Sequence, residues 1–526
     1  MRKFYITSPI YYVNAPPHLG HVYTNVVADV LARYHRLKGY DVFFLTGTDE
    51  HGAKVARSAH KAGKEPKAFV DELAAQFQEA ARTFHISYTD FIRTSDQGKH
   101  WPGAQKLWKQ LDDAQDLYKA SYKGLYCVGH EAFVTDKDLK NGRCLEHDIE
   151  PEVIEEENYF FRLSKYVSKI KEAILADTLN IKPPARRNEV LAMLEGGVED
   201  VSFSRPSKDI PWGIPVPGDD TQTMYVWCDA LSNYISALGY GRTNDENFRK
   251  YWPCDVHVIG KDILRFHAVI WPGMLLSAGL PFPKSIFIHG HILSGGKKMS
   301  KTLGNVIDPF QLQQEYGTDA VRNFVISEIP SFEDGDITIE RFREIYTARF
   351  SNGIGNLVSR IATMIERFFN GEIKKPDQAL LDNLPLKITD AACHVLGEEK
   401  TEESFYSSVQ AIIHTEERKY HQALEDFNLN RAAQSAWLLL RHCDWYIQEY
   451  QPFKLVKEDK NKGEAVLWNA ATLLLAGAWF LRPMIPETAE KIFEIFNVGS
   501  GGELLSWNEI TGKSIQPLFP RLDLDT

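Results

Sequence analysis

The sequence predicts a doubly wound α/β domain that is interrupted by an insertion and followed by an α-helical bundle. Three observations carry this prediction: a strand–helix–strand pattern opens the chain, turn-rich short strands fill the middle, and helical periodicity fills the last third. The chain has 526 residues, which is too many for one hydrophobic core, so several domains are expected.

The opening unit consists of a strand at about residues 4–8, a helix at 18–38 and a second strand at 41–47. In the helix, apolar residues recur every three or four positions, and Gly39 is placed to end it. The run DVFFLTG is continuously apolar, which is typical of a buried parallel strand. In such folds, ligands bind at the carboxyl ends of the strands.

The rest of the chain divides by composition. Residues 118–224 are rich in turns and charges, and strand-like runs then return at 224–230, 255–260 and 285–293. After residue 340 helices are expected, including 404–424, 428–449 and 464–482. The predicted boundaries are 1–117 for the first half of the α/β domain, 118–224 for the insertion, 225–293 for its second half, 294–350 for a lysine-loop region and 351–526 for the helical domain.

Composition limits the cellular setting and the partners. With a formal net charge of −11, any binding of nucleic acid must use local basic patches. The six cysteines are mostly far apart, and no signal-peptide pattern opens the chain, so a reducing, cytoplasmic setting is expected. The longest apolar run, 465–481, contains Asn469 and predicts a buried core helix, with no membrane partner.

Two histidines mark the start of the first helix, in the stretch NAPPHLGHVY. A helix N-terminus attracts phosphate through its unpaired N–H groups and partial positive charge. Gly20 lets a ligand approach the backbone, and His18 and His21 can donate hydrogen bonds to phosphate oxygens. Taken alone, such a pair is more often two surface histidines.

A second stretch, GGKKMSKTLGN at 295–305, places three lysines in a glycine-containing loop after a strand. Mobile ammonium groups on a flexible backbone suit closure over a polyphosphate leaving group. Taken alone, this loop would be read as a solvated lysine loop. Two such elements, each following an α/β strand, together favour a nucleoside triphosphate site.

These motifs resemble those of class I aminoacyl-tRNA synthetases, whose HIGH and KMSKS motifs are similar to HLGH and KMSKT here. The flanking stretches TSPIYYVNAPPHLGH, FFLTGTDEHG, YVWCDAL, IGKDILRFH and HGHILSGGKKMSKTLGN resemble the methionyl-tRNA synthetase family along essentially the whole chain. The resemblance implies a Rossmann-like catalytic domain, a zinc-knuckle insertion, a stem-contact region around the lysine loop, and a helical anticodon-binding domain.

The resemblance also implies a two-step reaction. Methionine and ATP form methionyl-adenylate and pyrophosphate, and the methionyl group then passes to the 3′-terminal adenosine of tRNA(Met), including the initiator tRNA. No covalent enzyme intermediate is expected, so positioning and charge stabilisation would provide the catalysis. The implied catalytic residues are His18, His21, Lys298 and Lys301. The implied ATP site adds Gly20, Gly260, Asp262 and Ser300, with Mg²⁺ accompanying the ATP.

Methionine requires a carboxylate for its ammonium group and an apolar, aromatic enclosure for its thioether. By the resemblance, Asp49 binds the ammonium group. The remaining pocket residues that it implies are Pro9, Ile10, Tyr12, Trp227, Ala230, Leu231, Tyr234, Ile263 and His267. Without the resemblance, the aromatic residues among them would be read as ordinary core. Pro9 and Ile10 replace the alanine and leucine of one major branch of the family.

The insertion contains two Cys-x-x-His pairs, Cys127 with His130 and Cys144 with His147. Four such ligands in two pairs fit a closed tetrahedral zinc site, which would be structural because no coordination position stays open. Relatives that bind zinc more often carry cysteine where this chain has His130, and some branches lack the metal.

In the helical domain, Asn352, Asn356 and Arg360 are spaced four apart, opposite the apolar face. Such a stripe is usually only a solvated surface. The resemblance of the segment NLVSR implies that Asn356 and Arg360 read the CAU anticodon, and that Phe453 stacks on a base where relatives usually carry tryptophan.

Two rival functions stay open at this point. The synthetases for leucine, isoleucine and valine usually carry a larger editing insertion, and the cysteine enzyme needs metal ligands that the α/β segments lack. A non-catalytic tRNA-binding paralogue would be expected to have a broken motif. Because the chain ends at PLFPRLDLDT without a further module, the family's architecture predicts a monomer.

Overall fold

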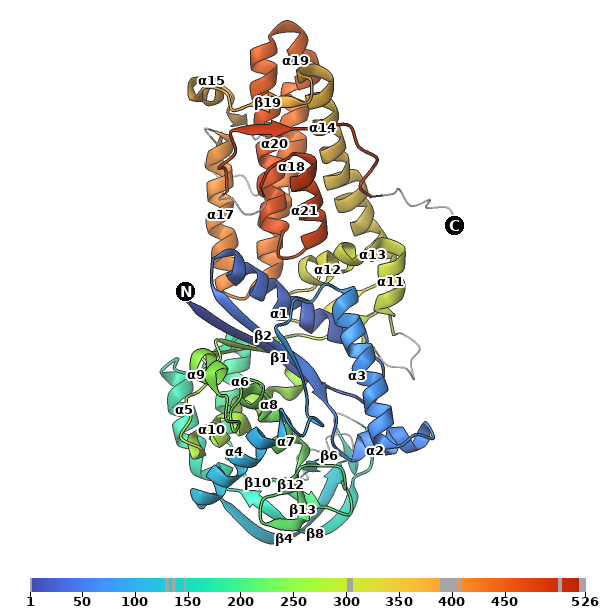
Figure 1. Ribbon diagram of the computed structural model, residues 1–526, viewed down its shortest axis with the longest axis vertical. Helices are drawn as coiled ribbons and strands as arrows, with labels where there is room; N and C mark the ends of the chain where they lie inside the picture. The colour runs from blue at the N-terminus through green and yellow to red at the C-terminus, as the bar shows by residue number, and fades with distance from the viewer. Residues whose placement is uncertain are drawn as a thin grey trace. The chain divides into compact units, whose positions relative to one another are not determined.

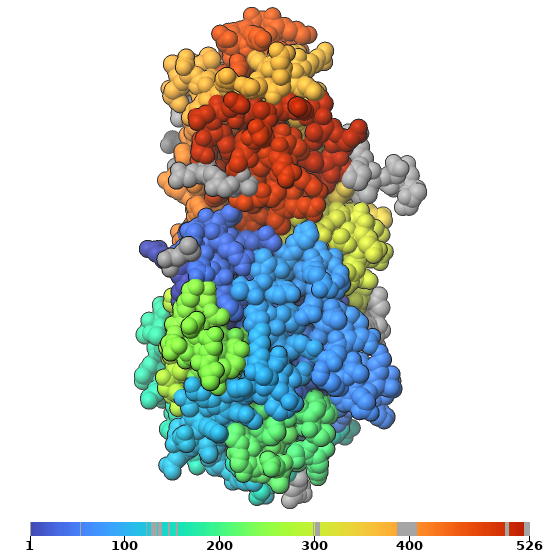
Figure 2. Space-filling view, viewed as in Figure 1, coloured from blue at the N-terminus to red at the C-terminus, as the bar shows by residue number. Residues whose placement is uncertain are grey.

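The computed structural model describes residues 2–127, 132–134, 139–145, 148–299, 306–387, 405–406, 408–499 and 504–519. The chain forms two units, Met1–His291 and Ile292–Thr526 (Figure 1). In Figure 2, blue atoms from the N-terminal part of the chain form much of the visible surface of the first unit.

A parallel sheet organises the first unit, with the strand order β3–β2–β1–β14–β15–β9. The strands are β1 (Lys3–Tyr12), β2 (Asp41–Asp49), β3 (Asp90–Arg93), β9 (Asn180–Lys182), β14 (Val256–Gly260) and β15 (Ser285–His289). From β1 the chain builds outward to β2 and β3 on one side, and β14 and β15 follow on the other. The switch point therefore lies between β1 and β14, where a doubly wound sheet opens a crevice for ligands. The predicted doubly wound α/β fold of this unit is confirmed.

Helices cover this sheet, and α1 packs against β1 and β2 (Figure 1). The α-helices of the unit are α1 (Leu19–Leu37), α2 (Ala53–Lys61), α3 (Pro66–Thr83), α4 (Trp101–Asp113), α5 (Val167–Leu175), α6 (Pro184–Glu195), α7 (Val226–Leu231), α8 (Asn233–Ser236), α9 (Glu246–Tyr251) and α10 (Trp271–Ser277). Its shorter helical turns are η2 (Leu163–Tyr166), η3 (Lys261–Ile263) and η4 (Phe266–Ile270). β2 is buried on both faces, as its apolar run predicts.

The predicted strand at 224–230 is wrong for most of its length. A strand ends at Met224, and the following residues, VWCDAL, form α7. A short apolar run fits a buried helix as well as a strand, so periodicity alone does not decide between them. The predicted strand at 285–293 is also divided, since β15 ends at His289 and a new strand begins at Ile292 in another sheet.

Smaller antiparallel sheets occupy most of the segment that the sequence assigns to the insertion. Their strands are β4 (Leu117–Cys127), β5 (Ala132–Val134), β6 (Leu139–Lys140), β7 (Arg143–Cys144), β8 (Glu152–Phe161), β10 (Val201–Ser202), β11 (Ser204–Pro206), β12 (Pro215–Val216) and β13 (Asp219–Met224). β9 lies within the same stretch of sequence but pairs with β15, so it is the edge strand of the parallel sheet.

The second unit is mainly helical, and α14, α17, α18 and α20 run side by side in Figure 1. Its helices are α11 (Pro309–Tyr316), α12 (Thr318–Ser327), α13 (Ile339–Ile345), η6 (Tyr346–Ile354), α14 (Gly355–Phe369), α15 (Gln378–Asp382), α17 (Val409–Glu425), α18 (Leu429–Tyr450), α19 (Pro452–Glu458), α20 (Lys460–Leu481) and α21 (Pro486–Ile495). Its short strands are β16 (Ile292–Ser294), β17 (Lys297–Lys298), β18 (Gly335–Ile337), β19 (Glu372–Lys374), β20 (Leu386–Lys387), β21 (Phe405–Tyr406) and β22 (Glu509–Thr511).

Helix α20 is the apolar run that the sequence assigns to the core. By length and composition it could cross a membrane, but 89% of its most apolar window is buried inside the structure. The prediction of a buried core helix is confirmed.

Candidate active site

The HLGH stretch forms the N-terminus of α1, with His18 as its N-cap. The His18 Nδ1 atom accepts a hydrogen bond from the Gly20 N–H at 3.1 Å, and the His21 Nδ1 atom accepts one from the His18 N–H at 3.1 Å. This is a capping box in which two imidazoles replace the usual hydroxyl and carboxylate groups. The pair therefore satisfies backbone donors that a helix start leaves unpaired.

This capping fixes the tautomers of both rings. A neutral imidazole whose Nδ1 accepts a hydrogen bond carries its proton on Nε2. Burial lowers the pKa of His21 well below its ordinary value, and the neighbouring His18 lowers it further, so His21 is neutral at pH 7. The two rings stack with centroids 3.8 Å apart. The helix start thus presents two adjacent Nε2–H donors together with its partial positive charge.

Close contacts restrict the residues around this helix start. A Cβ atom on Gly20 would lie 3.0 Å from the His18 ring. A small apolar core formed by α2, α3 and the end of β1 supports the other ring, since His21 packs edge-on against Tyr11 and Phe77. At Gly260, a Cβ atom would lie 2.7 Å from Asp262 Oδ1. A side chain at either of these two predicted ATP positions would therefore force the neighbouring His18 or Asp262 side chain to move.

The residues predicted to bind methionine lie at the carboxyl ends of β1 and β2 and on four helical segments. β1 has a bulge between Thr7 and Ile10, and Pro9, which has no N–H to donate, lies within it. Asp49 is the last residue of β2 and is only 6% exposed. The structure places Trp227, Ala230 and Leu231 on α7, Tyr234 on α8, Ile263 on η3 and His267 on η4.

A buried pair links two of these residues. The Tyr234 hydroxyl donates to His267 Nε2 at 2.7 Å, and His267 Nδ1–H donates to the Ile263 carbonyl at 2.9 Å. Burial lowers the pKa of His267 to about 4, so the ring is neutral and able to accept. Trp227 stacks on Phe266 with ring centroids 3.6 Å apart. Phe266 is a pocket neighbour that the sequence reasoning missed, although it lies directly before His267.

The lysine loop begins with a hairpin of β16 and β17 in the second unit. Leu293 pairs with Lys298 and Ser294 pairs with Lys297, across a turn formed by Gly295 and Gly296. Of the predicted residues, Ser300 and Lys301 lie outside the described residues, and only the backbone of Lys298 is described.

The two predicted zinc-binding cysteines come together in the insertion. Cys127 and Cys144 are both buried in one small cluster with Val134. The Cys144 carbonyl accepts a hydrogen bond from the Asp148 N–H, and the Cys144 N–H donates to the Ile149 carbonyl. His130 and His147 lie outside the described residues. Within the part that is described, no group of three or more histidine, cysteine, aspartate or glutamate residues is arranged to hold a metal.

The predicted anticodon residues lie on the surface of the second unit. Asn356 is exposed on α14, and Arg360 NH1 donates to Asp444 Oδ1 at 2.6 Å. Phe453 is 41% exposed, which is unusual for a large apolar side chain. Asn352 belongs to η6 and not to α14, because non-helical backbone angles at Gly353 separate their helical registers. The expected continuous stripe of three residues is therefore interrupted.

A groove of about 980 Å³ lies among η6, α14, α17 and α18. Its lining includes four cationic side chains and two indoles, which are Arg349, Lys419, Arg431, Arg441, Trp437 and Trp445. Asn352 and Asp444 also line it, so the Arg360–Asp444 pair lies at its edge. The sequence reasoning missed this groove because its residues come from two stretches far apart in the chain, η6–α14 and α17–α18.

Comparison with known proteins agrees with this arrangement. Residues 4–144 and 134–362 match the family described as tRNA synthetases class I (M), and residues 397–518 match the anticodon binding domain of methionyl tRNA ligase. The chain is 41% identical to the methionine–tRNA ligase of Clostridium acetobutylicum, over all of this chain and 79% of that protein. It is 40% identical to that of Thermotoga maritima, over 99% of this chain and 80% of that one.

Solved structures give the same result. The Mycobacterium tuberculosis methionyl-tRNA synthetase in complex with methionyl-adenylate has a TM-score of 0.89 and 34% identity, covering 99% of this chain and 100% of that one. The apo form of the same protein has a TM-score of 0.83 at 31% identity and covers 99% of each chain. The chain therefore belongs to the methionyl-tRNA synthetase family of class I aminoacyl-tRNA synthetases.

Proposed function

We propose that the chain is an enzyme that activates L-methionine with ATP and transfers the methionyl group to tRNA(Met), both initiator and elongator. The observation that carries this proposal is the imidazole capping box at the N-terminus of α1, beside the carboxyl edge of the sheet on which Asp49 lies. Membership of the family supports this class of reaction, and the geometry around His18, His21 and Asp49 explains how the chain performs the reaction.

In the activation step, a methionine carboxylate oxygen attacks the α-phosphorus of ATP and pyrophosphate leaves. The Nε2–H groups of His18 and His21 donate to the phosphate oxygens as negative charge develops on them. Because the capping bonds already fix both rings, little reorganisation is needed when the charge appears. Lys298 and Lys301 neutralise the departing pyrophosphate, as expected for lysines in a glycine-containing loop.

ATP binding extends to Gly20, Gly260, Asp262 and Ser300. Because Gly260 has no Cβ atom, the Asp262 carboxylate can lie close to the backbone there, and this brings two of the predicted ATP positions together. Mg²⁺ accompanies the ATP and supplies charge neutralisation of its phosphates.

Methionine is held by the ionised carboxylate of Asp49, which pairs with its ammonium group. Its thioether lies among the residues of β1, α7, α8 and η4 that the sequence predicts. The Tyr234–His267 hydrogen bond presents a neutral, polarisable wall, which favours sulfur over a charged side chain.

Amino-acid-dependent ATP–pyrophosphate exchange tests the function. We expect the exchange rate with methionine to exceed the rate with leucine, isoleucine, valine or cysteine by at least about two orders of magnitude. A pocket shaped for one side chain gives discrimination of this size. Faster exchange with any of these four would identify the rival synthetases, and no exchange with any amino acid would identify a non-catalytic paralogue.

We further propose a structural zinc ion held by Cys127, His130, Cys144 and His147. The burial of both cysteines in one cluster supports this, because two thiolates side by side are stable when they share a cation. A zinc ion held by these residues would cross-link the β4–β5 and β6–β7 segments.

Metal analysis of the purified protein should find about one zinc per chain, as expected for a four-ligand structural site. Cys144→Ser should lose the zinc. Cys443→Ala, which alters a buried cysteine in the helical unit, should retain it. A native protein without zinc would show that the two Cys-x-x-His pairs do not form a metal site.

The groove in the second unit supports a role in binding the anticodon arm. Cationic side chains suit the RNA backbone, and aromatic rings stack on unpaired bases. Of the two indoles in the groove, Trp445 is partly exposed and Trp437 is buried. Asn356 and Arg360 are in position to hydrogen-bond base edges, and Arg360 exchanges Asp444 for a base when RNA binds.

Phe453→Ala should raise the KM for tRNA about tenfold, because stacking of one base on an aromatic ring contributes roughly 1–3 kcal/mol. Methionine-dependent pyrophosphate exchange, which does not use tRNA, should change by less than about twofold. The matched control is Leu175→Ala, which removes another exposed apolar side chain and should change neither quantity. Loss of exchange in Phe453→Ala would instead indicate a structural residue.

We also propose that the protein is cytoplasmic and monomeric. The five cysteines in the described part of the chain are buried and none is in a disulfide, which suits a reducing compartment. The exposed large apolar side chains there come from separate segments and include Leu145, Leu175 and Val306, so they support no single dimer interface.

A further inference from the structure

A buried carboxylate in the first unit binds two imidazoles. Asp229 Oδ2 accepts from His51 Nδ1 at 2.5 Å, and Asp229 Oδ1 accepts from His100 Nε2 at 2.7 Å. The exposed fractions are 0% for Asp229, 2% for His51 and 0% for His100, so water does not share these bonds. A buried carboxylate must be compensated by such partners, and removing one of them is strongly unfavourable.

The hydrogen-bond pattern fixes the protons in this group. An ionised carboxylate only accepts, so His51 carries a proton on Nδ1 and His100 carries one on Nε2. The remaining His100 nitrogen, Nδ1, pairs with the Ser236 hydroxyl at 2.8 Å. Burial by itself would raise the pKa of Asp229, but the charges of His51 and His100 and their hydrogen bonds outweigh it, and the pKa lies below its ordinary value.

The group joins segments that otherwise belong to different parts of the pocket. His51 follows β2 and lies two residues after Asp49, while Asp229 lies on α7 between Trp227 and Ala230. His100 precedes α4, and Ser236 ends α8. One carboxylate therefore connects the loop with the predicted ammonium-binding residue to the helix with the predicted side-chain pocket.

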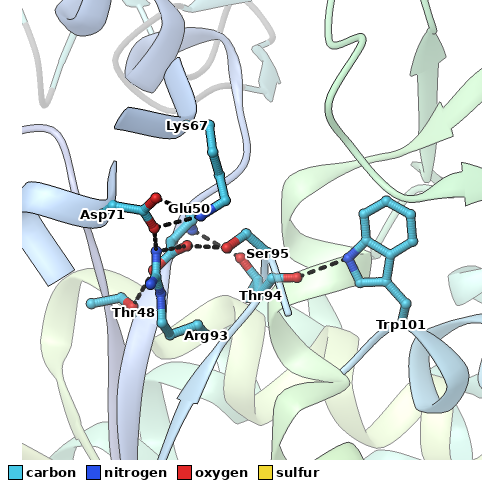
Figure 3. A network of polar contacts seen from close by, with 8 residues as sticks. All are labelled: Thr48, Glu50, Lys67, Asp71, Arg93, Thr94, Ser95 and Trp101. Carbon is cyan, nitrogen blue, oxygen red and sulfur yellow. Dashed lines mark hydrogen bonds and ion pairs between the residues drawn. The ribbon is translucent and has the colours of Figure 1, made fainter. Parts of the chain in front are cut away.

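A second network holds the same loop from the neighbouring residue (Figure 3). The fully buried Glu50 carboxylate accepts from Arg93 Nε at 2.6 Å and from the Thr48 hydroxyl at 2.6 Å, and it also binds the Ser95 hydroxyl. In Figure 3, Arg93 lies between Glu50 and Asp71. The Glu50 backbone N–H donates to the Thr94 hydroxyl at 2.9 Å. With residues 50 and 51 both fixed, Asp49 has little freedom to move.

We propose that Asp229, with His51 and His100, positions Asp49 against the methionine pocket and thereby sets the affinity for the amino acid. This inference rests on the proposed function and adds residues that touch neither ATP nor methionine. These residues fix the distance between the Asp49 carboxylate, which binds the ammonium group, and the side of the pocket that α7 forms. A displacement of about 1 Å between such elements is enough to weaken binding substantially.

The His51 side chain offers a paired test. His51→Asn keeps an N–H donor near the position of Nδ1, whereas His51→Ala removes it. In pyrophosphate exchange, we expect His51→Ala to raise the KM for methionine at least tenfold and to leave the KM for ATP within twofold of the wild type. His51→Asn should restore the KM for methionine to within about threefold of the wild type. Asp229→Asn leaves one side-chain oxygen to accept, so it cannot accept from both imidazoles. It should therefore raise the KM for methionine as His51→Ala does.

Asp116→Asn is the matched control. Asp116 is another fully buried carboxylate of the first unit, and it accepts from Lys165 at 2.6 Å and from Ser277 at 2.7 Å. We expect Asp116→Asn to lower the thermal midpoint while leaving the KM for methionine within twofold of the wild type. A purely structural role for Asp229 would give the two substitutions the same kinetic result.

The outcomes separate this inference from the proposed function. If the wild type shows no methionine-dependent exchange, the proposed function is wrong. If the wild type is active and His51→Ala retains a KM for methionine within threefold, the positioning role is wrong. An equal rise in the KM for methionine and for ATP would also contradict it. Should Asp229→Asn fail to fold, the two His51 variants still decide the question.

Discussion

His18→Asn should lower the kcat of methionine-dependent pyrophosphate exchange by about 100- to 1000-fold, the usual effect of removing one donor from a developing oxyanion. Asparagine is itself a good N-cap, so this substitution keeps the acceptor for the Gly20 N–H while removing the Nε2–H donor. It therefore separates the capping role of His18 from its role toward phosphate. The measurement is exchange at saturating methionine and ATP, with the thermal midpoint as the check on folding.

His18→Ala is the companion variant, because it removes both roles. We expect it to lose as much activity as His18→Asn and, in addition, about 0.5–2 kcal/mol of stability through the lost cap. If His18→Asn retained exchange within about threefold of the wild type, His18 would be only a capping residue and the phosphate role would be wrong.

Asp49→Asn should raise the KM for methionine by at least about 30-fold, corresponding to about 2 kcal/mol or more for an uncompensated buried charge. Asp49 is nearly inaccessible to water, so no solvent molecule replaces the lost attraction for the ammonium group. The volume and shape of the side chain are retained. The measurement is exchange as a function of methionine concentration at saturating ATP.

The KM for ATP provides the internal control for Asp49→Asn, since ATP is expected to bind at α1 and β14 and should be unaffected. Far-ultraviolet circular dichroism should match the wild type. A variant in which methionine binds normally would show that another group holds the ammonium, and the assignment of Asp49 would be withdrawn.

Much of the fold could be predicted because its signals are local. The apolar runs of β2 and α20 and the periodicity of α14 and α18 specify buried elements directly. The HLGH stretch likewise forms the helix start that its sequence predicts, and even the capping bonds join residues two or three apart. What the sequence did not indicate is that the imidazoles themselves form the cap.

Other features depend on contacts between distant residues and leave no local signal. Residues 226–230 form a helix because α7 packs into the core of the unit, although the same residues fit a strand equally well. Asp229 is separated by 178 residues from His51 and by 129 from His100, so their association cannot be read from spacing. The same holds for Arg360 and Asp444, which are 84 residues apart.

The proposed roles of His18, His21 and Asp49 all depend on where methionyl-adenylate binds. A crystal structure with a non-hydrolysable sulfamoyl analogue of methionyl-adenylate would show that position directly. We predict that the sulfamoyl oxygens lie within hydrogen-bonding distance of Nε2 of His18 or His21, and that the methionine ammonium group lies on the Asp49 carboxylate. An analogue bound away from the N-terminus of α1, or with its ammonium group on a different carboxylate, would contradict the account.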